Sequence, residues 1–257
     1  MFKLENVDPK EREEIIHFLK NHPYSLWTAE CDGPFDIGFM VFSRDSSELD
    51  RVITEISDKL SKYIHERVIS TTITGEYFTR LYLLDKESKR KQTKYGEVGK
   101  KEELDNTDWQ ILLKLSDNSR ISLVEMAKQL PIKIDAIRLR INRMEKVGII
   151  RSYSIIVNNP QINQLHYKIL IYLRDFSKQK LRSIREFCHQ NPNIVYLIKS
   201  LGVWDMELDI EVDSIEKYRE IMTSLLKQFP NTIKKYDAIQ IYKIHQYRFL
   251  PDKSMLV

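Results

Sequence analysis

Residues 104–150 contain three short runs of apolar residues at helical spacing, separated by polar breaks. Asp105 precedes the first run, and Asp108, three positions later, completes a helix-start signal. Ser122 and Glu125 have the S-x-x-E spacing of a capping box before the second run. Local chemistry therefore predicts two helix starts, and the spacing of the apolar residues predicts three helices.

The third predicted helix is amphipathic. Its apolar residues Ile134, Ile137, Ile141 and Met144 fall on one face, and Gly148 follows as a residue suited to a left-handed C-cap. The opposite face carries Asp135, Arg138, Leu139, Asn142, Arg143 and Lys146. That face is basic and includes an amide, so it is either the solvated outer face of a three-helix bundle or a surface for nucleic acid.

A basic helix face of this kind suits the major groove of DNA. Guanidinium and ammonium groups neutralise phosphates, and Arg and Asn side chains pair with purine edges through two hydrogen bonds. The tight spacing of the second and third helices is typical of a helix-turn-helix. We expect Arg138, Asn142 and Arg143 to face the groove, and Lys146 and Arg151 to meet backbone phosphate. The full predicted DNA-binding set is Lys133, Asp135, Arg138, Leu139, Asn142, Arg143, Lys146 and Arg151.

A dense, nearly gapless set of residues in this segment closely resembles the Lrp/AsnC (leucine-responsive, feast-famine) regulators of prokaryotes. The residues that carry the resemblance are Leu104, Asp105, Asp108, Ile111, Leu112, Leu115, Asp117, Arg120, Ile121, Ser122, Glu125, Ala127, Arg140, Glu145, Gly148, Ile149 and Ile150. In that family the helix-turn-helix head precedes a βαββαβ domain that binds an effector and dimerises. The resemblance implies a sequence-specific, DNA-binding transcriptional regulator that responds to an amino acid or a related small metabolite.

The sequence departs from the family in the turn and on the reading face. Pro131 and Lys133 stand where the family often has Gly in the turn and Ser at the helix cap. Ile134, Asp135 and Leu139 stand where family members tend to carry hydroxyl and basic residues. The resemblance therefore implies DNA binding without implying any particular target sequence.

The chain contains an internal repeat on either side of the predicted head. Pro23 and Pro192 each follow a helical stretch, and the offset between them (192 − 23 = 169) aligns further residues. The aligned pairs are Phe18 with Phe187, Trp27 with Tyr196, Gly33 with Gly202, and Asp36 with Asp205. The same offset superposes two amphipathic stripes, at residues 49–60 and 218–229, so we expect two copies of one domain.

The second copy shows the complete set of elements. Strands are predicted at residues 167–173, 194–199, 204–212 and 233–244, and helices at 178–190 and 213–229. This βαββαβ order is a ferredoxin-like sheet with helices on one face. In the first copy, Phe2 and Leu4 are all that remains of the first strand. We expect an ancestral tandem of two head-plus-sheet units that lost its leading head through truncation, start-site choice or the choice of chain boundaries.

These elements predict an α+β protein in which a winged helix-turn-helix head is flanked by two ferredoxin-like domains. The predicted segments are an N-terminal domain of the effector (RAM) type at 1–84, a charged linker at 85–103, the head at 104–152, a connecting strand and turn at 153–163, a C-terminal effector and oligomerisation domain at 164–250, and a tail at 251–257. The linker is predicted from its charge and its lack of an apolar stripe. Its basic residues Lys86, Lys89, Arg90, Lys91 and Lys94 form either a solvated tether or a secondary contact with DNA phosphates.

The motif Gly-x-x-Asp occurs in both copies. It stands as Gly33 to Asp36 and as Gly202 to Asp205. A structural interpretation is a hairpin in which Gly supplies an unusual backbone angle and Asp binds nearby amides. In the resembled family this loop lies at the oligomer contact where amino acids bind. The resemblance therefore makes Gly202 and Asp205 the first effector-binding candidates, and Gly33 and Asp36 the second.

Composition narrows the class of protein without identifying it. The chain of 257 residues is 42% hydrophobic and 30% charged, which is ordinary for globular domains, and its net charge of +4 permits nucleic-acid binding without requiring it. Cys31 and Cys188 form no disulfide framework, so we expect two core cysteines in a reducing cytoplasm. No segment has the length and apolarity of a signal peptide or a membrane span.

The sequence gives little indication of catalysis. The six histidines are scattered, and the metal-ligand, nucleophile and phosphate-loop motifs are lacking, so we predict no catalytic residues, no metal and no cofactor. Two alternatives remain open. One is a metabolite-sensing or assembly protein whose head no longer binds DNA, and the other is an enzyme resembling the sirohaem decarboxylases. Because a palindromic operator needs two heads, we expect at least a homodimer, whether the sheet copies pair within one chain or between chains.

Overall fold

The computed structural model describes residues 1–84, 88–96 and 102–251 of the chain. The predicted tail, except residue 251, and Lys86 lie outside the described residues. The described residues form two compact units. The sheet unit comprises those up to residue 96 together with Asn158–Tyr247 and Pro251, and the head unit comprises those from 102 to 157 together with Arg248–Leu250.

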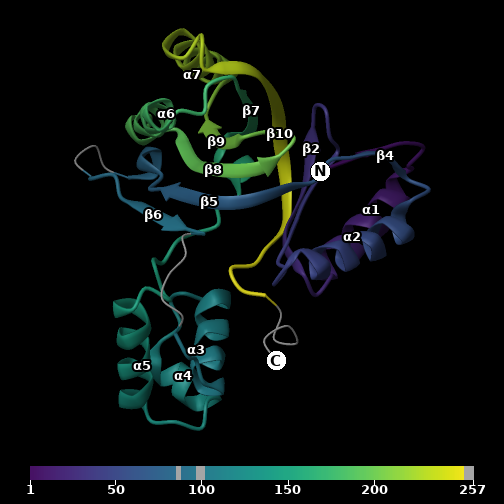
Figure 1. The fold of residues 1–257 in the computed structure, drawn as a ribbon. Helices are drawn as coiled ribbons and strands as arrows, with labels where there is room; N and C mark the ends of the chain where they lie inside the picture. Colours follow the sequence, from purple (N-terminus) through teal and green to yellow (C-terminus); the bar gives the residue numbers. More distant parts are fainter. Residues whose placement is uncertain (85–87, 97–101, 252–257) are drawn as a thin grey trace. The chain divides into compact units, whose positions relative to one another are not determined.

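The sheet unit contains two similar sets of elements, and only the second has the predicted βαββαβ order without change, because two strands, β4 and β5, follow α2 in the first (Figure 1). The first copy consists of β1 (Phe2–Leu4), α1 (Pro9–Asn21), β2 (Ser25–Asp32), β3 (Ile37–Val41), α2 (Ser46–Leu60), β4 (Ile64–Arg67) and β5 (Ser70–Phe78). The second consists of β7 (Leu165–Leu173), α6 (Lys178–Gln190), β8 (Ile194–Gly202), β9 (Met206–Val212), α7 (Ile215–Gln228) and β10 (Ile233–Tyr247). The α+β class and the short first strand are confirmed.

The two copies share one ten-stranded sheet, in the order β4-β1-β3-β2-β10-β7-β9-β8-β5-β6. The first part of β10 pairs with β7 of its own copy, and the last part pairs with β2 of the other copy. Likewise, β4 pairs with β1, whereas β5 pairs with β8 of the other copy. The pair Ile241 with Cys31 and the pair Thr72 with Ser200 are equivalent under the 169-residue offset. The copies therefore pair within one chain, through two equivalent strand exchanges.

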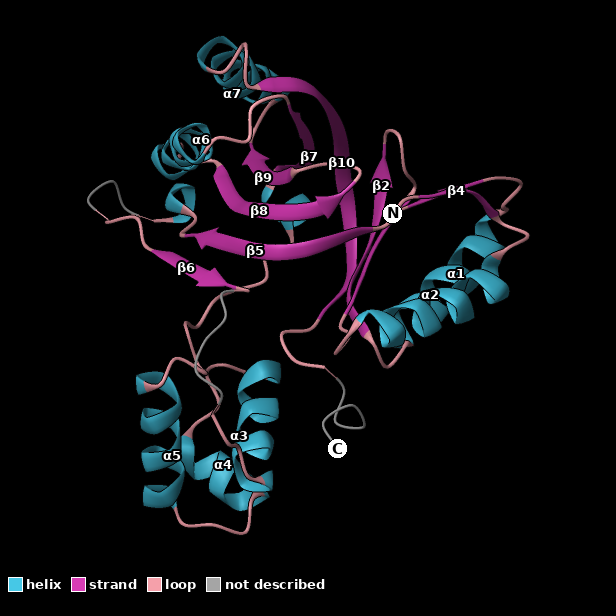
Figure 2. Ribbon diagram, viewed as in Figure 1, coloured by secondary structure: helices cyan, strands magenta, loops and turns pink. Residues whose placement is uncertain are grey.

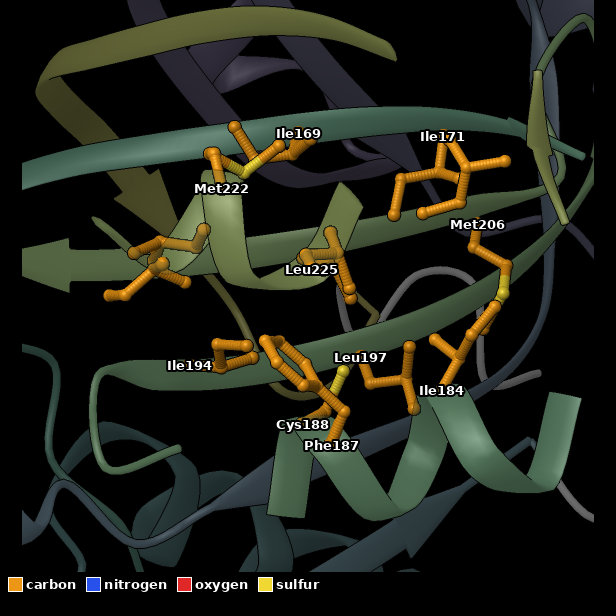
Figure 3. Packing of buried hydrophobic residues seen from close by; sticks show 14 of the residues in the cluster. Ile169, Ile171, Ile184, Phe187, Cys188, Ile194, Leu197, Met206, Met222 and Leu225 are labelled. Atoms are coloured by element: carbon orange, nitrogen blue, oxygen red, sulfur yellow. The ribbon is translucent and has the colours of Figure 1, made fainter. Parts of the chain in front are cut away.

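Alternation along the strands divides the apolar residues of the sheet unit between two faces. In β7, Ile169 and Ile171 join a core covered by α6 and α7, as Figure 3 shows, whereas Leu170 points to the opposite face. A separate core lies between α1, α2 and the strands of the first copy. The opposite face holds the central core, made of Trp27, Ala29, Cys31, Phe35, Leu170, Trp204, Ile239 and Ile241. Because its residues come from both copies, the central core joins them in addition to the strand pairing. Cys31 and Cys188 are buried free thiols, as expected.

The segment interpreted as a linker is partly structured in the described residues. After the short 3₁₀ helix η1 (Leu81–Leu83), strand β6 (Gln92–Tyr95) pairs with β5. A Cβ atom at Gly75 would lie 1.9 Å from Tyr95 Cζ, so the tyrosine ring occupies space that only glycine leaves open. This strand was not predicted, because the segment is charged and pairing to β5 does not require an apolar stripe in β6.

The head unit consists of the helices α3 (Asn106–Asp117), α4 (Leu123–Gln129) and α5 (Ile134–Lys146), visible in Figure 2. Their buried residues Ile111, Leu112, Met126, Leu130, Ile137 and Met144 form its core. The predicted start of α3 is confirmed, since Asp105 and Asp108 form a reciprocal capping box. At α4 only half of the predicted box forms: Ser122 Oγ accepts from the Glu125 amide, while the Glu125 carboxylate accepts from Gln129.

The connection after the head differs from the prediction. No strand forms within residues 102–157, all of which the structure describes, so neither a β-wing nor the predicted connecting strand at 153–157 is present there. The reason is burial: Tyr153, Ile155 and Ile156 remain exposed, so their alternation does not correspond to a buried sheet face. The predicted turn is the 3₁₀ helix η2 (Asn159–Ile162).

Candidate functional site

The outward face of α5 is the strongest candidate site. Ile137 and Met144 are fully buried, so they fix which side of the helix points inward. All eight residues predicted to bind DNA are exposed: Lys133, Asp135, Arg138, Leu139, Asn142, Arg143, Lys146 and Arg151. Lys133 is the N-cap of α5 and makes no side-chain cap bond, and the remainder follow along the helix or just beyond it. We name the exposed residues between Lys133 and Lys146 the α5 face.

Two of the predicted groove-facing cations have acidic neighbours. Arg138 Nη1 lies 2.9 Å from Asp135 Oδ1, and both side chains are more than half exposed. An exposed pair of this type contributes little free energy, so Arg138 can exchange Asp135 for a phosphate at small cost. Arg143 Nη2 lies 2.5 Å from Asp108 Oδ2, and that carboxylate is only 1% exposed. Arg143 is therefore held toward α3, although half of its side chain is exposed.

Sequence reasoning missed the role of Arg140. Its Nη1 donates to Asp105 Oδ2 at 2.7 Å and to Asp108 Oδ1 at 2.8 Å, so it connects α5 to the start of α3. The Asp108 amide, and then the Arg140 guanidinium, lower the pKa of the Asp105 carboxyl. The two aspartates were interpreted only as helix caps. A basic residue on the border between the buried and exposed sides of α5 was the available signal for this interhelical contact.

The Gly-x-x-Asp motifs form the β8–β9 and β2–β3 hairpins and make equivalent contacts. Asp205 Oδ2 accepts from the Leu173 amide at 2.7 Å, and Asp36 Oδ2 accepts from the Leu4 amide at 2.8 Å. Lys3 also pairs with Asp36, at 3.2 Å. These bonds anchor each hairpin to the first strand of its own copy. The hairpin interpretation thus accounts for both carboxylates, and effector binding at the same loops stays a prediction.

The glycines of the same motifs provide close approach to the neighbouring copy. Gly202 has φ +151°, and a Cβ there would lie 3.0 Å from the Ile69 carbonyl oxygen. Gly33 has φ +121°, and a Cβ there would lie 2.9 Å from the carbonyl oxygen of Ala238. Each glycine therefore lets a strand of the other copy pass beside the hairpin.

We expect Gly202→Ala to lower the unfolding free energy of the sheet unit by about 1–3 kcal/mol, because it adds backbone strain and a contact with a neighbouring carbonyl. Gly148→Ala is the matched control, since Gly148 also has a positive φ but a Cβ there would have nothing within 4 Å. Urea unfolding monitored by circular dichroism measures both losses. An equal loss in the two variants would contradict a steric role for Gly202.

A buried polar network on the central face of the sheet unit was not predicted. Lys168 Nζ lies 3.1 Å from Glu207 Oε2 and 3.0 Å from Asp209 Oδ2, and His166 Nε2 lies 3.0 Å from Asp209 Oδ1. Burial alone would raise the pKa of Asp209, but the Lys168 ammonium outweighs it and lowers that pKa to about 2. The signal in the sequence was alternation of charged and apolar residues on two strands that pair, β7 and β9.

A second buried ion pair ties the segment after β5 to the second copy. Arg80 Nε lies 2.7 Å from Glu211 Oε2, and Arg80 Nη2 lies 2.9 Å from Glu211 Oε1. Tyr82 also donates to Glu211, and Asn159 Nδ2 donates to it at 3.2 Å. With several donors around one carboxylate, this arrangement is that of a structural anchor. Across the described residues, no group of three or more His, Cys, Asp or Glu side chains is arranged to hold a metal ion.

A search for membrane-spanning helices among the described residues finds none with the necessary length and apolarity.

The chain is similar to known proteins in its helix-turn-helix head and in part of its sheet unit. The model of the AsnC-type helix-turn-helix domain matches residues 104–145. The proline dehydrogenase transcriptional activator of Rhodobacter capsulatus is 26% identical over 129 residues, covering 50% of this chain and 84% of that protein. The transcriptional regulator AzlB of Bacillus subtilis is 26% identical over 128 residues, covering 49% of this chain and 82% of that protein.

Solved structures share the fold. An AsnC family transcriptional regulator from Agrobacterium tumefaciens superposes with a TM-score of 0.52 at 19% identity, covering 60% of this chain and 100% of that one. A transcriptional regulator from Neisseria meningitidis, solved as a complex with L-methionine, gives a TM-score of 0.53 at 19% identity, covering 60% of this chain and 99% of that one. The match at residues 104–145 shows that this chain carries an AsnC-type helix-turn-helix domain, and about half of the chain is similar to transcriptional regulators that contain such a head.

Proposed function

We propose that this protein regulates transcription by inserting the α5 face into the major groove of double-stranded DNA. The proposal rests on one observation. The residues predicted to face the groove, Arg138, Asn142 and Arg143, are exposed on α5, and the opposite side of this helix packs into the head core. Asn142 offers an amide for base edges, while Arg138 and Lys146 supply charge for phosphates. Lys133 and Arg151, near the two ends of the helix, extend the basic surface.

The described part of one chain contains a single head. It also contains two sheet copies, which pair with each other through β2–β10 and β5–β8. A palindromic operator requires two heads about one helical turn or a multiple of a turn apart. We propose that two chains associate on such an operator. Light scattering of the protein with its DNA should give two chains per duplex, and one chain per duplex would contradict this stoichiometry.

We further propose that an amino acid modulates DNA binding through the sheet unit. The support comes from the Neisseria meningitidis neighbour solved with L-methionine and from the two Gly-x-x-Asp hairpins. The carboxylates of Asp205 and Asp36 each hold a strand amide, so a ligand at these loops would share an acid that already has a structural partner. A ligand that bound a hairpin more tightly in the DNA-bound protein than in the free protein would raise the affinity for DNA by the same factor, and the opposite preference would lower it.

One experiment tests the function. Genomic fragments are selected on the purified protein at two salt concentrations, with and without a panel of amino acids. We expect a recurring sequence motif, weaker retention at the higher salt concentration, and a change in retention with at least one amino acid. Amino-acid binding without retention of any DNA would instead support the metabolite-sensing alternative, and motif recovery unaffected by every amino acid would contradict the effector proposal alone.

A further inference from the structure

Among the described residues of the α5 face, Leu139 is the one strongly apolar side chain, and it is 70% exposed. It lies on the same side of the helix as Asp135, Arg138 and Asn142, one turn from each end of that group. Ile137 and Met144, on the opposite side of α5, are buried in the head core, and Ile141 is partly buried against it. Leu139 thus contributes nothing to that core while presenting an aliphatic surface among polar groups.

The neighbouring cations already have acidic partners on the head itself. Arg143 is held by the buried Asp108, and Arg138 is paired with Asp135. Leu139 also borders a shallow hollow in the head surface, together with Asp105, Ala136, Arg140 and Arg143. Along the helix, Leu139 and Asn142 are therefore neighbours that present, respectively, an apolar surface and an uncharged amide.

Only thymine displays a methyl group in the major groove, and an aliphatic side chain contacts it favourably while leaving the donors and acceptors of other bases unsatisfied. We propose that Leu139 is a specificity-determining residue that packs against the C5 methyl group of a thymine. This inference rests on the proposed function, and it specifies the DNA site further: each half-site contains a thymine at the position facing Leu139. Asn142, one turn further along, is placed to pair with an adjacent adenine edge.

A hydroxyl or guanidinium group favours purine edges or phosphates, whereas leucine favours the thymine methyl group.

The test uses the full-length protein and a duplex recovered by selection. Each thymine is replaced in turn by deoxyuridine, which removes only the C5 methyl group, and affinity is measured by fluorescence anisotropy. We expect the wild-type protein to bind about fourfold more weakly at one position in each half-site, the factor that corresponds to one buried methyl group. Leu139→Ala should weaken binding to the thymine duplex and should no longer distinguish thymine from deoxyuridine there.

Val124→Ala is the matched control, because Val124 is an exposed aliphatic residue on α4. It should keep the thymine preference of the wild type. If the wild-type protein shows no deoxyuridine effect at any position, or if Leu139→Ala retains the effect, the inference is overturned while the proposed function stands. If the wild-type protein shows no salt-sensitive DNA binding at all, the proposed function itself fails.

Discussion

Replacing Arg80 with methionine is expected to lower the unfolding free energy of the sheet unit by about 3–5 kcal/mol, the usual effect of removing one partner of a buried ion pair. The Arg80 side chain is 8% exposed and that of Glu211 1%, so solvent screens the pair little. Without the guanidinium, the Glu211 carboxylate is left buried and loses its ion pair, while the neutral donors Tyr82 and Asn159 remain beside it. Denaturant unfolding at neutral pH measures the loss.

A double variant and the pH dependence of stability distinguish an ionic anchor from simple loss of packing. In the double variant Arg80→Met/Glu211→Leu, no charge is left unpaired, so most of the lost stability should return. Burial tends to raise the pKa of Glu211, but the Arg80 hydrogen bond outweighs it and lowers that pKa below its ordinary value. The pair therefore stabilises the wild type at neutral pH and loses its effect as pH falls through the lowered pKa. The deficit of Arg80→Met should accordingly shrink in acid; a deficit independent of pH would contradict an ionic anchor.

Reversing charge on the α5 face is expected to weaken DNA binding by about a hundredfold or more. The variant Arg138→Glu/Lys146→Glu removes two cations from the predicted contact surface and places two anions beside the phosphates. Arg138 and Lys146 are exposed, so folding of the head should be unaffected, as circular dichroism can verify. Affinity for the selected duplex is measured by fluorescence anisotropy at constant salt.

The matched control is Lys178→Glu/Lys180→Glu. It changes the net charge by the same amount, at exposed positions in the first turn of α6 in the sheet unit. We expect this control to alter affinity by no more than a few-fold, because it changes the net charge while leaving the α5 face intact. Comparable losses in the two variants would show that net charge, and not the α5 face, governs binding.

Local signals in the sequence were sufficient for the helices of the head and for the order of elements in the second copy, whereas the division of the last strand of the first copy into β4 and β5 was not predicted. The Asp105 capping pair, the stripe from Ile134 to Met144 and the offset of 169 residues each report on contacts within a few turns, or on a repeated pattern. The exposed α5 face follows directly from the stripe, since fixing the buried side of a helix fixes its opposite side.

Long-range pairing was not accessible from the sequence. The exchange of β5 and β10 between copies depends on which edges meet, and strand alternation does not encode that choice. Arg80 and Glu211 lie 131 positions apart, so their ion pair could not be predicted. Arg143 was predicted only to bind DNA, because the sequence does not show its contact with Asp108 of another helix. The exposed residues at 153–157 had the alternation of a strand without the burial that makes one.

Binding of duplex DNA by the cations of the α5 face is the central claim. The slope of log Kobs against log salt concentration, measured for the selected duplex between about 50 and 200 mM salt, tests this most directly. With several of the basic residues from Lys133 to Arg151 on phosphates, the slope should be clearly negative, at about −0.9 for each phosphate neutralised, and shallower by about 1 in Lys146→Ala. A slope near zero, or one identical in wild type and Lys146→Ala, would contradict the claim.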